Sequence, residues 1–297
     1  MDQRLVPQLK NSDEIKNVLR QVEVSFQLSD GRKVETLLIY LLPDAEGNSL
    51  NDFFTVIKNG IMANFVFSCT EVEKKLGINI PDAASKLFEK AIRKISQHTA
   101  HGELGELILF TLLDVYLEAP KLLSKISTKT SRRMPVFGAD AVHGQFYDGK
   151  FRLMLGESKL HQDFNSAATK ATESIKSAKD TYQSEFDLLD SNMDFPNMDS
   201  DLENYLLEIL DPFSNIDLDE VLHSPCFIGF SNPDLLKING DDFEKSYVEI
   251  ACQHVGNYFG KIEKQGITID KTMLILLPFD SVPDLVTNFI KYMDIKK

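Results

Sequence analysis

The dipeptide Asp148-Gly149, placed between two strand-like runs within residues 134–159, is the strongest local constraint on how this chain folds. Asp-Gly readily takes the left-handed backbone conformation that a two-residue hairpin turn requires. The apolar residues on both sides of the dipeptide have the composition of strands. The pattern therefore predicts an antiparallel β-hairpin in the middle of the chain.

The segments after this hairpin predict alternating helices and strands. Residues 163–184 have helical periodicity and begin with an acidic residue, which the helix dipole favours. Two short apolar runs, 226–230 and 273–278, have the length and composition of buried strands, and helical patterns at 242–262 and 282–293 flank the second run. Together they indicate an α/β fold, a mixed sheet flanked by helices.

The first part of the chain predicts a second hairpin and a pair of helices. Residues 22–28 alternate between apolar and polar side chains, Ser29-Asp30-Gly31 supplies a turn, and residues 34–42 return as an apolar strand. Residues 82–119 have strong helical periodicity, and we expect two helices there, broken near residues 98–102.

Charge is distributed unevenly along the chain. The 297 residues carry 32 bases and 45 acids, a formal net charge of −13, yet fourteen acids lie between Asp180 and Leu236, where no Lys or Arg occurs. Residues 121–179, by contrast, carry eleven bases and five acids. The basic stretch suits a polyanionic ligand, and the acidic stretch suits either repulsion of that ligand or docking onto a basic partner, which we favour. A solvated face is the alternative for each stretch.

The sequence argues against several classes of protein. No stretch reaches the roughly 18 apolar residues that span a bilayer, and no secretory signal is recognisable, so we expect a cytoplasmic protein. The three cysteines include no Cys-x-x-Cys pair, which argues against a disulfide framework and a structural zinc site. No P-loop, Gly-x-Ser-x-Gly or His-Glu-x-x-His motif is present, so ATPase, serine hydrolase and zincin chemistry lack their required groups.

Three ionisable residues of the central hairpin are candidates for catalysis. Asp140 lies in its first strand, and Glu157 and Lys159 lie near the end of its second strand, where side chains two residues apart point to the same face. Two carboxylates at a strand end suit Mg²⁺, which takes one or two carboxylates together with water and phosphate oxygens. Lys159 would orient an attacking water or stabilise its deprotonated form.

A further carboxylate can come from the predicted helix before the hairpin. Glu103 and Glu106 are three residues apart and share a helix face, so one of them could reach the metal. The alternative is structural: Glu157 and Lys159 would form an exposed pair on an edge strand, and the two helix acids would lie on a solvated face.

Three histidines, His101, His143 and His161, flank these candidate residues in the sequence. Each could contact phosphate or water, because a neutral imidazole both donates and accepts a hydrogen bond. The alternative for each is a structural hydrogen bond.

These residues and their order resemble the PD-(D/E)xK nuclease superfamily. Asp140 is followed, after sixteen residues, by Glu157-x-Lys159, and a helical segment with Gly102-x-x-x-Glu106 precedes the hairpin. The wider context, Gly-Glu-Leu-Gly-Glu before Gly-Ala-Asp-Ala-Val-His and Gly-Glu-Ser-Lys, is similar to the HamA family of nuclease subunits in the Hachiman anti-phage defence system. The resemblance is concentrated in residues 101–180.

The resemblance implies a restriction-endonuclease-like core that cleaves DNA with Mg²⁺, or with Mn²⁺ in its place. It implies that Asp140, Glu157 and Glu106 hold the metal, that Lys159 is the catalytic lysine, and that Glu106 rather than Glu103 is the helix acid. The implied partners are DNA and a superfamily 2 helicase of the HamB type.

The predicted organisation is an N-terminal β-containing element, residues 1–75, followed by a nuclease core, residues 76–297, with an acidic insertion at about residues 185–220. Ala139 stands where the superfamily motif has a proline, a departure from the pattern. Two other functions remain open. One is a stand-alone restriction- or recombination-type endonuclease, and the other is a non-catalytic subunit that regulates a helicase.

Overall fold

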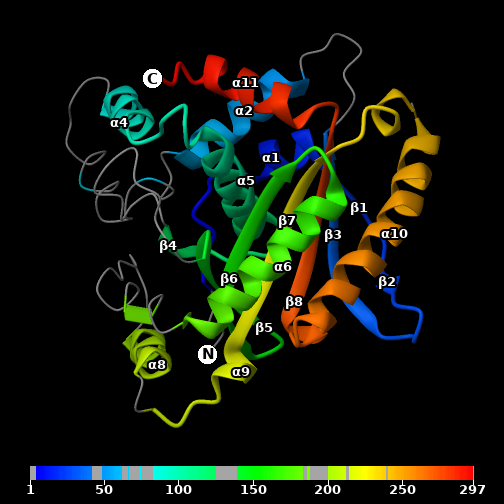
Figure 1. The fold of residues 1–297 in the computed structure, drawn as a ribbon. Helices are drawn as coiled ribbons and strands as arrows, with labels where there is room; N and C mark the ends of the chain where they lie inside the picture. The colour runs from blue at the N-terminus through cyan, green and yellow to red at the C-terminus, as the bar shows by residue number, and fades with distance from the viewer. Residues whose placement is uncertain are drawn as a thin grey trace.

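One eight-stranded sheet runs through the molecule (Figure 1). The computed structural model describes residues 5–41, 49–61, 66, 74, 83–124, 139–182, 186–187, 200–211, 214–238 and 240–296. The strands are β1 (Leu19–Val22), β2 (Phe26–Gln27), β3 (Lys33–Leu41), β4 (Lys121–Ser124), β5 (Ala141–Tyr147), β6 (Lys150–His161), β7 (Leu222–Ser231) and β8 (Thr272–Phe279). Across the sheet they follow the order β1-β3-β8-β7-β6-β5-β4, and β2 pairs with β3.

The middle of the sheet is parallel and both sides are antiparallel. Strands β3, β8, β7 and β6 run parallel to one another, whereas β1 pairs antiparallel with β3, β5 with β6, and β4 with β5. This mixed sheet confirms the predicted fold class. Strand β3 pairs with β8, so the N-terminal strands share their sheet with the C-terminal part of the chain.

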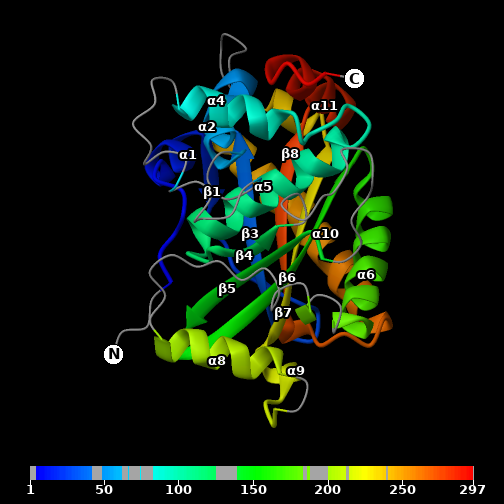
Figure 2. The ribbon, with the colours of Figure 1, turned by 90° about the vertical axis from the view of Figure 1, so that its left-hand side faces the viewer.

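Helices cover both faces of the sheet (Figure 2). One face carries α1 (Ser12–Val18), α2 (Ser49–Gly60), α4 (Ala83–Ile92), α5 (Ala100–Tyr116) and α11 (Val282–Tyr292). The other face carries α6 (Phe164–Asp180), α8 (Ser200–Leu210) and α10 (Asp241–Lys264). The short helical segments are α9 (Leu218–Val221), η2 (Leu235–Lys237) and η3 (Ile269–Lys271). None of the helices in the described ranges has the length and apolar character needed to cross a membrane.

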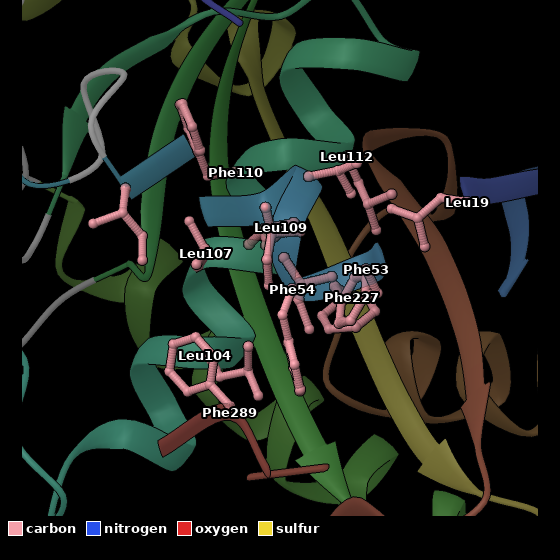
Figure 3. Close-up of a cluster of buried hydrophobic side chains, with 14 of the residues drawn as sticks. Leu19, Phe53, Phe54, Leu104, Leu107, Leu109, Phe110, Leu112, Phe227 and Phe289 are labelled. Atoms are coloured by element: carbon pink, nitrogen blue, oxygen red, sulfur yellow. The ribbon is translucent and has the colours of Figure 1, made fainter. Parts of the chain in front are cut away.

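Helix α5 is the centre of the larger core. Thirteen of its seventeen residues are buried, because its sequence is apolar almost all the way round and it lies between the sheet and other helices. Figure 3 shows Leu104, Leu107 and Leu109 of α5 beside Phe53 and Phe54 of α2. The two helices predicted in residues 82–119 are confirmed as α4 and α5, but the break between them lies at residues 93–99 rather than near 98–102, because α5 already begins at Ala100.

The hairpin of β5 and β6 forms as predicted. Tyr147 pairs with Lys150 across the turn, where φ is +50° at Asp148 and +73° at Gly149. Asp tolerates this left-handed conformation and Gly adopts it without steric cost. The turn thus fixes the register that brings Ala141 opposite Gly156 at the other end of the hairpin.

Helix α8 belongs to the predicted acidic insertion, much of which, including residues 188–199, lies outside the described residues. Its Leu206 and Ile209 pack into a core cluster with Phe151 and Leu153 of β6. Other positions of the helix, among them Glu203 and Glu208, are exposed. The described part of the insertion is therefore an amphipathic helix docked on the sheet.

Candidate active site

Asp140 lies one residue before β5, at the point where the hairpin ladder ends. Its backbone N–H donates to the carbonyl of Gly156 at 2.9 Å. Its Oδ2 accepts two hydrogen bonds, from the backbone N–H of Ser158 at 2.9 Å and from Ser158 Oγ at 2.8 Å. The Asp140 carboxylate thus accepts the hydrogen bond from the Ser158 N–H, in the place of a backbone carbonyl of a longer β5. The two bonds from Ser158 hold the Asp140 side chain against β6.

Glu157 and Lys159 point to one face of β6 and form an ion pair. Glu157 is only 5% exposed, and its partner across the sheet is Cys226 of β7. Ser158 points to the opposite face, toward α5. The alternative of an exposed edge-strand pair is therefore wrong for Glu157, because β7 pairs with this part of β6 and the carboxylate is buried.

Lys159 lies under the influence of both carboxylates. Burial of the ammonium group lowers its pKa, but the charges of Glu157 and Asp140 and the hydrogen bond to Glu157 outweigh burial and raise the pKa of Lys159 above its usual value. Lys159 therefore stays charged at neutral pH. The charges of the two carboxylates thus both act on Lys159, and the common face of Glu157 and Lys159 is the one that the two-residue spacing predicted.

Uncharged groups lie behind Glu157. Burial, together with the nearby Glu157 carboxylate, raises the pKa of the Cys226 thiol, which is thus protonated at neutral pH. Burial likewise raises the pKa of Tyr258 on α10 well above its usual value, and the Cys226 thiol and Glu157 add to that shift. The groups behind Glu157 are therefore uncharged at neutral pH, and the Glu157 carboxylate forms its ion pair with Lys159.

Helix α5 crosses β6 at very close range. A Cβ atom at Gly105 would lie 3.1 Å from Ser158 Oγ, and one at Gly156 would lie 3.0 Å from Leu109 Cδ2. Successive residues of an α-helix are rotated by about 100° around the helix axis. Around the axis of α5, Glu106 is therefore about 100° away from the direction in which Gly105 points, and Glu103 is about 160° away. Glu103 is buried and Glu106 is partly buried. The angle favours Glu106 as the acid nearer the sheet, and its role as a metal ligand stays a prediction.

The described residues contain no group of three or more His, Cys, Asp and Glu side chains that could hold a metal ion. The donors that fit Mg²⁺ are the two carboxylates that act on Lys159, those of Asp140 and Glu157. Their chemistry suits the ion, which completes its shell with water and substrate oxygens when the protein supplies only one or two carboxylates.

The three flanking histidines have different positions. His143 is fully buried, its Nδ1 lies 2.7 Å from the carbonyl oxygen of Ala119, and burial lowers its pKa to about 3. It is therefore a structural group. His101 is exposed and His161 partly exposed, and the two influence each other electrostatically at the end of β6.

Nothing in the sequence marks Ser158 as a site residue, yet it is the residue that holds Asp140 in place. Its contribution depends on two features that no local pattern reveals. One is the start of β5 at Ala141, and the other is the close packing of Gly105 over the Ser158 side chain.

A comparison with known families covers nearly the whole chain: residues 14–293 match the HamA family model. The chain belongs to the HamA family. Members of this family are components of Hachiman anti-phage defence, and the chain therefore has a role in that system. All the candidate site residues discussed above lie within the matched range. No curated protein matches the sequence.

Proposed function

We propose that the chain is the metal-dependent deoxyribonuclease of its Hachiman system and that it acts together with a superfamily 2 helicase. The observation that supports this most directly is the buried Glu157, paired with Lys159 and next to Asp140, on a strand end. An ion pair in this position is costly to desolvate, and a pair of well-packed apolar residues would stabilise the fold as well or better. The arrangement is therefore better explained by chemistry than by stability.

The order of elements supports the same proposal. Helix α5 and the short strand β4 precede the β5–β6 hairpin; helix α6 follows the hairpin, and strand β7 comes after α8 and α9. Apart from β4, α8 and α9, this is the order that the superfamily resemblance implies. The proposed site lies where α5, the start of β5 and the second half of β6 meet.

In the proposed reaction, Asp140 and Glu157 would hold the metal and Lys159 would act on the water or the phosphate. A bound Mg²⁺ would lower the pKa of the attacking water and neutralise charge on the phosphate. Ser158 orients Asp140 by its two hydrogen bonds. Lys159, kept charged by the two carboxylates, can donate an N–H to the water or to a phosphate oxygen.

The test is cleavage of supercoiled plasmid with Mg²⁺ or Mn²⁺. We expect Glu157→Gln, Asp140→Asn and Lys159→Met each to lower the rate by about 10²-fold or more, since each removes a group that acts on the reacting atoms. Glu173→Gln, an exposed acid on α6, is the matched control and should cleave like the unaltered protein. Full activity in Glu157→Gln would refute the assignment.

The helix acids can be ranked in the same assay. Glu106→Gln should lower the rate more than Glu103→Gln, because the direction of Glu106 on α5 is closer to that of Gly105, which faces β6. The opposite ranking would transfer the role to Glu103.

The partnership needs a separate test, copurification with a large helicase and measurement of its ATPase rate. Cleavage by the chain alone at the rate of the complex would indicate the stand-alone endonuclease instead. A complex that forms but never cleaves would indicate a non-catalytic subunit. That second alternative is favoured by one observation, the lack of a three-ligand metal group among the described residues.

A further inference from the structure

The tip of the β5–β6 hairpin places one aromatic ring beside two cations. Tyr147 pairs with Lys150 across the turn, and Arg152 is the next residue on the same face of β6. In an antiparallel pair, side chains that are directly opposite or diagonal to each other are within reach. The guanidinium carbon of Arg152 lies over the Tyr147 ring, 4.1 Å from its centre. Tyr147 is nevertheless 53% exposed, so much of the ring faces solvent.

Glu35 of β3 fixes the position of Arg152. The Nη1 and Nη2 atoms of Arg152 donate to the two carboxylate oxygens of Glu35, each at 3.0 Å. This two-bond pair sets the plane of the guanidinium group. The Tyr147 ring therefore stacks on a group that is already held in place, which lowers the entropy cost of binding a ligand to the ring.

A cavity of about 250 Å³ lies beside this stacked pair. Its lining combines apolar and polar side chains from the two hairpin strands, from β3 and β8, and from the residue that ends α5, among them Glu35, Leu117, Gln145, Tyr147, Arg152 and Met273. Typical small-molecule sites have volumes of about 300–1,000 Å³. The cavity therefore suits a ligand with one small ring system rather than a large cofactor.

The polar groups of the cavity suit an uncharged ring with donors and acceptors at its edge. The charges of Arg152 and Glu35 offset each other. A guanidinium has five N–H groups, and Glu35 takes two of them, so Arg152 has three further donors. The Gln145 amide, which donates from Nε2 to the carbonyl of Leu117, also has an oxygen acceptor. A nucleobase combines such an edge with a flat face that stacks on aromatic rings.

We propose that this cavity binds one unpaired base of a nucleic-acid strand, which stacks on Tyr147, and that Lys150 contacts the adjoining phosphate. The proposal rests on the proposed function in taking DNA as the ligand. An exposed aromatic ring next to basic side chains is the arrangement with which proteins bind single strands without sequence preference. Arg152 and Glu157 project from opposite faces of β6, so the base site is separate from the proposed active site on the same hairpin.

The first experiment measures binding of a fluorescein-labelled 20-nucleotide oligothymidylate by the full chain in EDTA, where cleavage plays no part. We expect Tyr147→Ala to weaken binding about 5-fold or more, because one base loses its stacking partner. Tyr147→Phe keeps the ring and should bind within about 2-fold of the unaltered protein. Lys150→Ala should reduce the slope of log affinity against log salt by about 0.7, whereas Tyr147→Ala, which removes no charge, should leave that slope unchanged.

Tyr292→Ala is the matched control. Tyr292 is 37% exposed on α11, which Figure 2 shows at the other end of the molecule from the arrowhead of β5. We expect its affinity for the oligothymidylate to equal that of the unaltered protein. Equal losses in Tyr147→Ala and Tyr292→Ala, or no loss in Tyr147→Ala, would overturn the proposal.

A second readout reports on stacking directly, because the sequence contains no tryptophan. Tyr147→Trp creates a single tryptophan at the proposed site, and a base stacked on it should quench its fluorescence. Tyr292→Trp should stay unquenched. Saturation with oligothymidylate without quenching of Tyr147→Trp would overturn the base site. Equal quenching by a 20-base-pair duplex, whose bases are paired, or by dTMP at the same concentration would overturn the assignment to an unpaired base within a strand.

The base site and the proposed nuclease activity can fail independently. If Tyr147→Ala binds the oligothymidylate weakly but no metal supports plasmid cleavage, the base site stands and only the nuclease activity fails. If the unaltered protein cleaves plasmid but Tyr147→Ala binds the oligothymidylate as tightly as it does, the base site is wrong and the nuclease activity stands.

Discussion

Replacing Lys159 by methionine should destabilise the protein in a way that depends on pH. Methionine keeps most of the apolar stem of lysine but removes the charge, so the buried Glu157 carboxylate loses its ion pair with residue 159. Breaking a buried ion pair by removing one partner costs about 3–5 kcal/mol. Because the Lys159 side chain is 26% exposed and that of Glu157 7%, we expect a value near the lower end, about 3 kcal/mol.

The companion variants separate charge from packing. Glu157→Gln leaves Lys159 partly exposed and near Asp140, so its cost should be smaller, about 1 kcal/mol. The double variant Glu157→Gln with Lys159→Met leaves neither charge behind and should recover about 2 kcal/mol relative to Lys159→Met alone.

The pH dependence has a definite sign. In Lys159→Met, burial should raise the pKa of Glu157 above its unfolded value of about 4.3, so stability is lost as pH rises through the folded pKa. In the unaltered protein the raised pKa of Lys159 contributes stability that is fully present below the unfolded pKa of about 10.4, hence throughout pH 5–8. The difference in free energy of unfolding between the unaltered protein and Lys159→Met, measured by urea denaturation, should therefore be larger at pH 8 than at pH 5.

Two results would refute this reasoning. One is a cost below about 1 kcal/mol at pH 8, which would mean that water reaches Glu157 and compensates its charge. The other is a double variant no more stable than Lys159→Met, which would mean that the loss comes from packing.

Three other predictions concern the core, the N-terminal segment and the metal. Gly229→Ala should cost about 1–3 kcal/mol in urea denaturation, because the added Cβ would overlap Leu160 and lie 2.9 Å from Phe279 Cε2; an unchanged midpoint would contradict the packing. Asp114 accepts hydrogen bonds from the N–H groups of Gln8 and Leu9, yet burial raises the pKa of its carboxyl group to about 6. The free energy of unfolding of the unaltered protein, relative to that of Asp114→Asn, should therefore fall as the pH rises from 4 to 7. A constant difference would show that the carboxylate is solvated. Mg²⁺ or Mn²⁺ should support cleavage and Ca²⁺ should not, whereas stoichiometric zinc in protein purified without added metal would contradict an oxygen-ligand site.

Local sequence patterns predicted the features that depend on local chemistry. The Asp148-Gly149 turn follows from the backbone preferences of two residues, and the common face of Glu157 and Lys159 follows from strand alternation. The start of α6 was marked by Asp163, whose side chain caps the helix.

Features that depend on distant contacts were not predictable in this way. The alternation in residues 22–28 predicted one strand, whereas the chain forms β1 and β2 on either side of residues 23–25, because both align along the longer β3. The burial of Glu157 depends on β7, and the close packing of α5 on Ser158 and Leu160 of β6 depends on the missing side chain at Gly105. Neither contact leaves a periodic signal in the sequence.

The parallel pairing of β3 with β8 has a consequence for how the protein is made. About 230 residues separate the end of β3 from the start of β8, so a ribosome needs roughly 10–50 s to synthesise the second after the first. During that time the edge of β3 that pairs with β8 has no partner strand, and β7, once made, has β6 on one side but lacks β8 on the other. A translation product that stops before β8 contains Asp140, Glu157 and Lys159 but not the completed sheet that holds them, so we expect such fragments to bind chaperones or aggregate rather than to cut DNA.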